Sequence, residues 1–388
     1  MARRLLTALL LCLPAGQVVA QAGPAADARA AMIALDVAGA ALEDATSARD
    51  RVAALTQTVK AYETGLSALR EGLRRASLRE ATIQTAFDAE SDRLAQLLGV
   101  LQTIEKAPEP SLLIHPDGPI GTARSGMILS DVAPALQNQA DTLRQGLEEL
   151  ATIRALQEGA LDTLQNGLAG AQTARAKLSQ AIAARTELPR RFVQDKAAMQ
   201  ALIESSDTLA SFASGLLSDP VSPQSAGTLD DFASAKGRLD LPVLGRLLRG
   251  FNDSDAAGVK RPGWVIATRP LALVTTPWPA TIRYLGPLLD YGNVAILEPG
   301  DGYLMVLAGL GQLYGEVGEV LAQGAPIGLM GGAAPEIRSE VAENGTDQAF
   351  LIELVQGAGT EASETLYIEL RENQTPVDPA DWFTAGKE

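Results

Sequence analysis

The sequence is poor in the side chains that most often carry chemistry. Its 388 residues include one cysteine (Cys12), one histidine (His115) and only 4% aromatic residues. Cys12 lies in an N-terminal apolar run, so the chain beyond that run has no disulfide, no thiol nucleophile and no thiolate metal ligand. No histidine follows residue 115, which excludes Cys/His and Ser/His/Asp catalytic sites from the C-terminal half.

Basic residues are also scarce. Lysine and arginine number 32 against 47 acidic residues, which gives a formal net charge of −15. The sequence has no basic stripe for phosphate groups, so we expect no nucleic-acid partner. Hydrophobic residues make up 46% of the chain. With so few aromatics, alanine and leucine supply most of them, a mix that favours long helices.

The N-terminus has the pattern of a secretory signal peptide. Arg3 and Arg4 precede an apolar run at 5–13, and the short residues VVA stand before the expected cleavage point. We expect residues 1–20 to be removed on export, which predicts a periplasmic protein. Lipoprotein processing at Cys12 is disfavoured because leucines precede this residue, where a small residue is required.

Two long stretches carry heptad seams. From 31 to 104 the apolar positions alternate in steps of three and four, and only Glu80 and Glu90 are polar. This pattern predicts one helix about 110 Å long. A second seam runs from 136 to 182, and a proline-rich segment at 106–121 separates the two.

The two seams predict an antiparallel coiled-coil hairpin over 21–189 with its tip near 105–135. Two strands of a parallel homodimer are the alternative. A shorter helix is expected at 191–217 and a linker at 218–228, so we interpret 190–235 as a helical regulatory segment with its linker. From 236 to 388, short β-branched runs alternate with glycine and proline, which predicts an all-β domain.

The β-domain carries a series of short motifs in a fixed order. They are RPGWV (261–265), PGDGY (299–303), Gly309-Leu310, TLYIE (365–369) and TPVDPADWF (375–383). This order resembles that of the LytM (lysostaphin-type) zinc metallopeptidases, which have a duplicated hybrid motif β-fold. The family motifs are His-x-Gly-x-Asp, His-Gly-x-Gly-Tyr, His-Leu, His-x-His-Phe-Glu and a Val-Asp-Pro-x-x-Trp ending.

The metal-site positions of that family are substituted in this sequence. The replacing residues are Arg261, Val265, Pro299, Gly309, Thr365 and Tyr367. A catalytic zinc usually takes three imidazole or carboxylate ligands and a water. Arg261 cannot ligate a metal, Val265 has no donor atom, and Tyr367 would have to lose its proton. We therefore expect a degenerate domain with no metal, no cofactor and no enzymatic activity.

The order of parts resembles the EnvC-like murein hydrolase activators. The resemblance implies a non-catalytic activator of a periplasmic N-acetylmuramoyl-L-alanine amidase, close to peptidoglycan, in septal splitting. It also implies that the hairpin docks on an FtsEX-type membrane complex. Candidate partner-groove residues are Arg261, Val265, Tyr303, Gly309, Tyr367, Glu369 and Arg371. Candidate membrane-complex contacts, apolar and near the hairpin tip, are Leu112, Leu113, Met127 and Ile128.

Several alternatives stay open. The resemblance implies that the 191–217 helix covers the partner groove, whereas it could instead pack on the hairpin shaft. An active zinc endopeptidase of peptidoglycan is one alternative function, against which the missing ligands count. A periplasmic adaptor subunit of an efflux or secretion complex is another. The stretch 332–364 is longer than the family pattern, and the sequence gives it no role.

Overall fold

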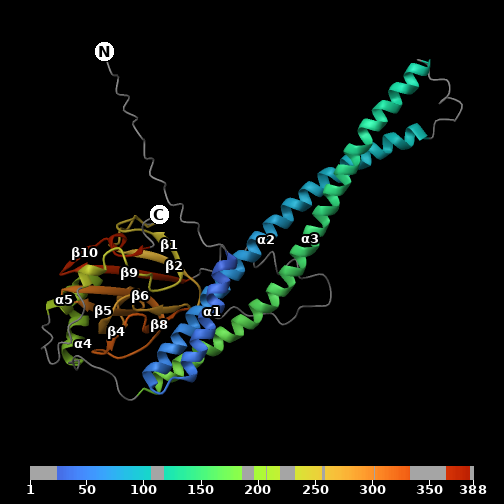
Figure 1. Cartoon of the computed structure of the whole chain (residues 1–388). Coiled ribbons are helices and arrows are strands. Elements are labelled where there is room, and N and C mark those ends of the chain that lie inside the picture. The colour runs from blue at the N-terminus through green and yellow to red at the C-terminus, as the bar shows by residue number, and fades with distance from the viewer. Residues whose placement is uncertain are drawn as a thin grey trace, which may run out of the picture.

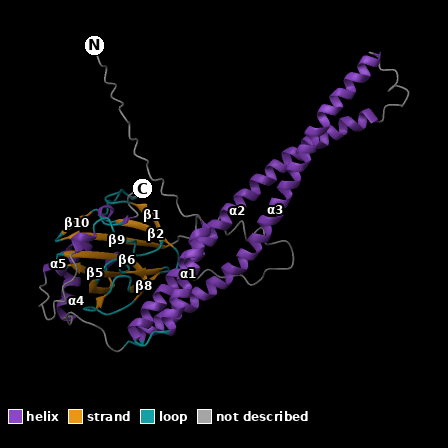
Figure 2. Ribbon diagram, viewed as in Figure 1, coloured by secondary structure: helices purple, strands orange, loops and turns teal. Residues whose placement is uncertain are grey.

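The computed structural model describes residues 24–105, 118–185, 196–206, 208–218, 232–255, 258–300, 302–332 and 364–384. A long helical hairpin projects from one side of a β-sheet domain (Figures 1 and 2). The expected fold class, an antiparallel helical hairpin followed by a β-sheet domain, is confirmed. The predicted signal peptide lies outside the described residues, and no helix within them is long and apolar enough to span a bilayer.

The first heptad seam forms two helices instead of the predicted single one. Helix α1 (Pro24–Glu43) and helix α2 (Ala48–Glu105) are separated by a short reversal. A Cβ on Gly65 of α2 would lie 3.2 Å from the Ala31 Cβ of α1, so the two helices pack closely along the alanine-rich seam. The chain turns because Ser47 caps α2: its Oγ accepts a hydrogen bond from the Asp50 backbone N–H at 3.1 Å.

Helix α3 (Gly118–Ala183) runs antiparallel to α2. Ion pairs join the two helices along the shaft, at Arg79–Glu149 (2.7 Å) and Arg154–Glu80 (3.0 Å). Glu80 and Glu90, the polar members of the first seam, therefore have roles: Glu80 binds Arg154, and Glu90 accepts from the Gln139 amide. The pairing is that of an intramolecular hairpin.

Of the four predicted membrane-complex contacts, Met127 is the one whose side chain is described. Leu112 and Leu113 lie outside the described residues. Ile128 lies within α3, but its side chain is not among those described. Met127 is 70% exposed.

The β-domain is built on one antiparallel sheet that contains the strand order β1-β2-β9-β6-β5-β4-β7. Strand β8 pairs with β3 and β6, and β10 pairs with β9. The strands are β1 (Gly245–Arg249), β2 (Trp264–Thr268), β3 (Leu273–Thr275), β4 (Ala280–Pro287), β5 (Asn293–Gly300), β6 (Tyr303–Leu313), β7 (Val320–Leu321), β8 (Pro326–Met330), β9 (Glu364–Glu372) and β10 (Thr375–Val377).

One face of the sheet carries the main core. Ile266, Leu307 and Ile368 are buried there. The 3₁₀ turn η2 (Phe232–Ala235) also belongs to this core, since the Phe232 ring stacks on Trp382 at 4.4 Å. The β-domain thus begins a few residues before the expected boundary at 236.

The opposite face is covered by two short helices, α4 (Lys196–Ser205) and α5 (Leu209–Ser218). The predicted single helix at 191–217 is therefore interrupted. Thr208 starts α5 by accepting a hydrogen bond from the Ser211 N–H at 3.1 Å. Leu202 of α4 packs so closely on Gly215 of α5 that a Cβ there would lie 2.3 Å from the leucine.

The base of the hairpin docks on a third part of the sheet, around β3 and β8. An apolar cluster unites Val59 and Leu178 of the hairpin with Leu273 and Leu329 of the sheet. Glu63 lies inside this contact and accepts the Leu273 N–H at 2.9 Å. Burial raises the pKa of the Glu63 carboxyl, while its ion pair with Arg175 (2.9 Å) opposes that rise.

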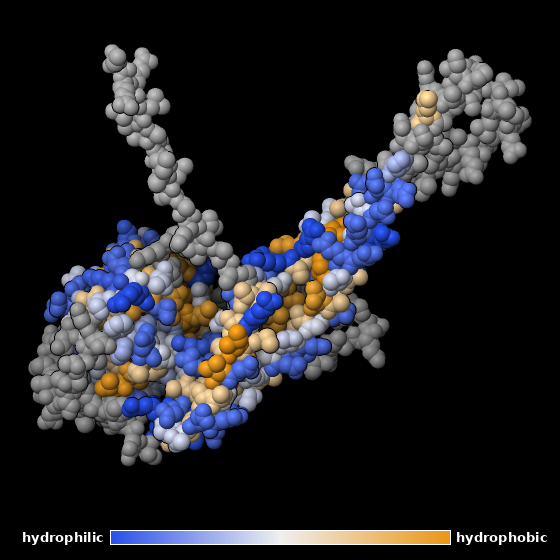
Figure 3. Space-filling view, viewed as in Figure 1, coloured by the Kyte–Doolittle hydropathy of each residue, from blue (hydrophilic) through white to orange (hydrophobic). Residues whose placement is uncertain are grey.

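Apolar side chains also gather on the outside of the lower hairpin, where α1 lies along α2, while the middle of the shaft is mainly hydrophilic (Figure 3). The exposed members on α1 are Met32, Ile33 and Val37.

Candidate partner-binding face

Strand β9 brings three of the predicted groove residues onto one face. Tyr367, Glu369 and Arg371 are spaced by two, and alternate side chains of a strand point to the same side. Tyr367 pairs with Val265 on β2 and with Ala308 on β6, so it lies in the middle of the sheet. We call this the Tyr367 face.

The side chains of Tyr367, Glu369 and Arg371 are joined in a linear series of hydrogen bonds. The Tyr367 hydroxyl donates to Glu369 Oε2 at 2.7 Å, and Arg371 Nη1 donates to Glu369 Oε1 at 2.6 Å. Arg371 Nη2 donates to the Gln374 carbonyl at 2.6 Å. Each of the three side chains is 6% exposed or less. The Glu369 carboxylate is therefore already engaged at both oxygens.

The protonation state of Tyr367 follows from its surroundings. Burial raises the pKa of the phenol far above its ordinary range, and the neighbouring Glu369 carboxylate raises it further. Arg261 lowers it by a smaller amount. The phenol therefore stays protonated and donates its hydrogen bond, and it does not become a phenolate ligand.

Arg261 and Tyr291 lie at the mouth of the Tyr367 face. The exposed Arg261 guanidinium lies over the Tyr291 ring, 5.3 Å from its centroid, and this ring is 5.8 Å from that of Tyr367. A cation stacked on an aromatic ring is a common feature of protein contact surfaces. Tyr291 was not among the sequence candidates, because its 3₁₀ turn (Leu289–Tyr291) meets β9 only through the tertiary fold.

The two remaining candidates differ from these. Gly309 has φ +95°, and a Cβ there would lie 2.5 Å from the Thr365 carbonyl oxygen, so it is required for backbone approach. Tyr303 packs on the opposite face, where its ring is 5.2 Å from Phe232 and its hydroxyl donates to Glu372 at 2.9 Å. The structure therefore gathers Arg261, Val265, Tyr367, Glu369 and Arg371 but leaves Tyr303 apart.

Helix α5 packs on the same side of the sheet as the Tyr367 face, where its contacts are with β4. Phe212 is fully buried and meets Tyr284 edge-on, with ring centroids 4.9 Å apart. The C-terminal end of α5 is fixed by Arg283, whose Nη2 donates to the Leu216 carbonyl at 2.7 Å. Arg283 is itself paired with Glu298 at 3.1 Å. Of the two expected placements, the structure shows the helix on the sheet and not on the hairpin shaft.

The residues present do not fit a hydrolytic zinc. Among the described residues no group of three or more His, Cys, Asp or Glu side chains is close enough to hold a metal ion. At the resembled ligand positions stand an arginine, a valine and a protonated tyrosine, none of which is a suitable ligand. No reaction step through a metal follows from this arrangement.

No protein-family model matches the chain. An uncharacterized protein of Neisseria meningitidis serogroup B is 26% identical over 157 residues, which are 40% of this chain and 22% of that protein. This chain thus covers about a fifth of that relative's length.

The solved structures to which the chain is similar are peptidases of the M23 (LytM) type and relatives of them. A putative M23 peptidase of Pseudomonas aeruginosa has a TM-score of 0.32 at 16% identity, covering 49% of this chain and 64% of its own. Csd3 of Helicobacter pylori has a TM-score of 0.27 at 18% identity, with 37% and 34% covered. The catalytic domain of lysostaphin from Staphylococcus simulans has a TM-score of 0.26 at 15% identity, with 35% and 89% covered. Each similarity concerns only part of this chain, so the activities of those proteins are not assigned to it.

Proposed function

We propose that this chain is an exported, non-catalytic activator of a periplasmic N-acetylmuramoyl-L-alanine amidase. The observation that carries the proposal is the covered Tyr367 face. The sheet positions that resemble a peptidase centre hold no suitable metal ligands, and a helix of the same chain packs on the same side of the sheet, against Tyr284 of β4. This is the arrangement of a binding surface with a built-in cover.

The face accepts an amphipathic helix, because it already holds one. Three large apolar side chains of α5, Leu209, Phe212 and Leu216, are each 3% exposed or less against it. A partner helix with a comparable apolar stripe would replace them. Arg261 is exposed at the mouth of this face and is placed to make the first contact with an acidic or aromatic partner residue.

In this proposal the hairpin recruits the protein to a membrane complex. Its base is fixed to β3 and β8, on a different part of the sheet from α5. Its far end projects away from the β-domain (Figure 1). A membrane complex of the FtsEX type could therefore hold the tip without blocking the Tyr367 face.

The decisive experiment is dye release from purified cell-wall sacculi, with the protein alone and with candidate amidases. We expect no release by the protein alone and stimulated release in the presence of the client amidase. Arg261→Glu should weaken the stimulation, whereas Lys260→Glu, at the exposed neighbouring residue, should not. Release by the protein alone would favour the zinc endopeptidase, and a lack of stimulation with every amidase would favour an adaptor role.

A further inference from the structure

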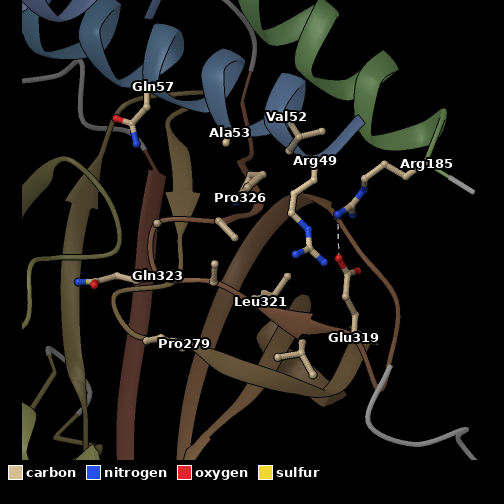
Figure 4. Close-up of a pocket in the computed structure, with 14 residues that line it drawn as sticks. Arg49, Val52, Ala53, Gln57, Arg185, Pro279, Glu319, Leu321, Gln323 and Pro326 are labelled. Atoms are coloured by element: carbon tan, nitrogen blue, oxygen red, sulfur yellow. Dashed lines mark hydrogen bonds and ion pairs between the residues drawn. The ribbon is translucent and has the colours of Figure 1, made fainter. Parts of the chain in front are cut away.

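A cavity of about 420 Å³ lies where the base of the hairpin meets the β-domain (Figure 4). The first turns of α2 form one wall, and the β7–β8 turn with its flanking strands forms the other. Val52, Leu321 and Pro326 make much of the lining apolar. No residue of the Tyr367 face contributes to it, so this is a separate site.

The cavity carries one uncompensated positive charge. Arg185 Nη1 donates to Glu319 Oε1 at 2.8 Å, and these two charges neutralise each other. Arg49 lines the same cavity, and its guanidinium is turned into it in Figure 4. Within the described part of the chain Arg49 forms no hydrogen bond or ion pair, and the buried Arg185 Nε also has no partner. Arg49 is an exposed residue, so its guanidinium donors are accessible from solvent and can bind an anionic ligand that enters the cavity.

Two further features favour an anion. Arg49 and Val52 belong to the first turns of a 58-residue helix, whose N-terminal end adds partial positive charge. The chain as a whole has a formal charge of −15, so a cationic cavity is opposite in sign to the rest of the molecule. Its size and apolar walls exclude a bare inorganic ion as the best occupant, since such an ion would leave those walls in contact with water.

We infer that this cavity binds the C-terminal end of a short peptide with small apolar side chains. The carboxylate would accept two parallel hydrogen bonds from the Arg49 guanidinium. The side chains would cover Val52 and Leu321, and the Gln57 amide would bind a peptide group. Because the ligand touches the hairpin and the sheet together, its binding stabilises the docked arrangement of the two.

Isothermal titration calorimetry on the full-length mature protein tests this site, with N-acetyl-alanyl-alanine as the probe. We expect saturable binding at one site, and binding of the C-terminal amide to be weaker by about tenfold or more, since a charge-assisted bond is lost. Arg49→Gln should weaken binding of N-acetyl-alanyl-alanine by a similar factor. Arg51→Gln is the matched control, because Arg51 is exposed on the same helix but does not line the cavity.

A second variant keeps the test independent of charge. Ala53→Phe places a ring in the cavity and should abolish binding of the acid, while circular dichroism shows that helix content is unchanged. The proposal is overturned if the peptide acid and its C-terminal amide bind with equal affinity, or if Arg51→Gln weakens binding as much as Arg49→Gln does. It is also overturned if no binding of the peptide is seen up to about 10 mM. Inorganic phosphate binding as tightly as the peptide would also overturn it. None of these readouts depends on an amidase, so the site and the proposed function fail separately.

Discussion

Replacing Phe212 by alanine should release α5 from the Tyr367 face. The ring is fully buried and packs edge-on against Tyr284. Truncating a buried phenylalanine costs about 3–5 kcal/mol. If the helix alone undocks, this loss shifts the ratio of covered to uncovered face by about a hundredfold or more, because each 1.4 kcal/mol is a factor of about ten.

Hydrogen exchange followed by mass spectrometry measures that shift directly. Amides of α5 should exchange about a hundredfold faster in Phe212→Ala, while amides of the central strands β5 and β6 keep their protection. Gln200→Ala on α4 is the control, because Gln200 is exposed and its side chain donates a hydrogen bond to the exposed Glu204 on the same helix. In the sacculus assay the Phe212→Ala protein should activate the amidase at lower concentration than the wild type.

The reasoning is refuted if α5, β5 and β6 lose protection together. Phe212 would then be part of the domain core, and the helix could not act as a removable cover. Fast exchange of α5 without any gain in amidase activation would refute the functional half alone. In that case α5 would still be a separable element, and control would lie elsewhere in the molecule.

Four other outcomes follow from the structure. Elemental analysis of the purified mature protein should find no stoichiometric zinc, and about one zinc per chain retained through mild chelation would contradict this. Arg371→Met should lower the Tm by about 10 °C, since it leaves the Glu369 carboxylate buried and unpaired, and Glu369→Gln added to it should restore most of the loss. Met127→Glu should abolish septal recruitment with helix content unchanged, and normal recruitment would move the membrane contact away from the tip. Two neighbouring arginines hold the pKa of Glu71 at about 2, below its ordinary value near 4.5. The stabilisation from Glu71 is therefore full above pH 4.5 and is lost as the pH falls toward 2, so Glu71→Gln should flatten that part of the acid transition in circular dichroism, and an unchanged transition would argue against the pairing.

The helical half shows what a heptad pattern can and cannot predict. The pattern states which side of a helix is apolar, and it continued without a break across residues 44–47. It therefore predicted one helix where the chain reverses. A signal for the reversal is present in the sequence, because Ser47 and Asp50 form a Ser-x-x-Asp capping pair, but the heptad pattern alone does not take account of it. The long-range pairing of α2 with α3 could be predicted because the proline-rich segment separates two comparable seams.

The part of the candidate face that lies on the single strand β9 could be predicted from the sequence. Tyr367, Glu369 and Arg371 share a side because side chains alternate along β9. Tyr303 was assigned to the same groove, but the register places it opposite Glu372, which faces the main core. Register between distant strands is set by bulges and by the packing of the whole sheet, and a single sequence does not contain this information. Tyr291 was missed because its 3₁₀ turn meets β9 only through the tertiary fold.

A cover of this kind has to be neither too strong nor too weak. If docking of α5 is worth about 3 kcal/mol, the face is open less than about 1% of the time, and a partner binds about 150-fold more weakly than it binds the open face. The ratio of amidase Kd values for the wild type and for Phe212→Ala would therefore measure the strength of the cover. A ratio near one would mean that the partner does not compete with α5. The binding surface would then have to lie outside the area that α5 covers, and the exposed Arg261, stacked on the half-buried Tyr291, would be the first place to look for it.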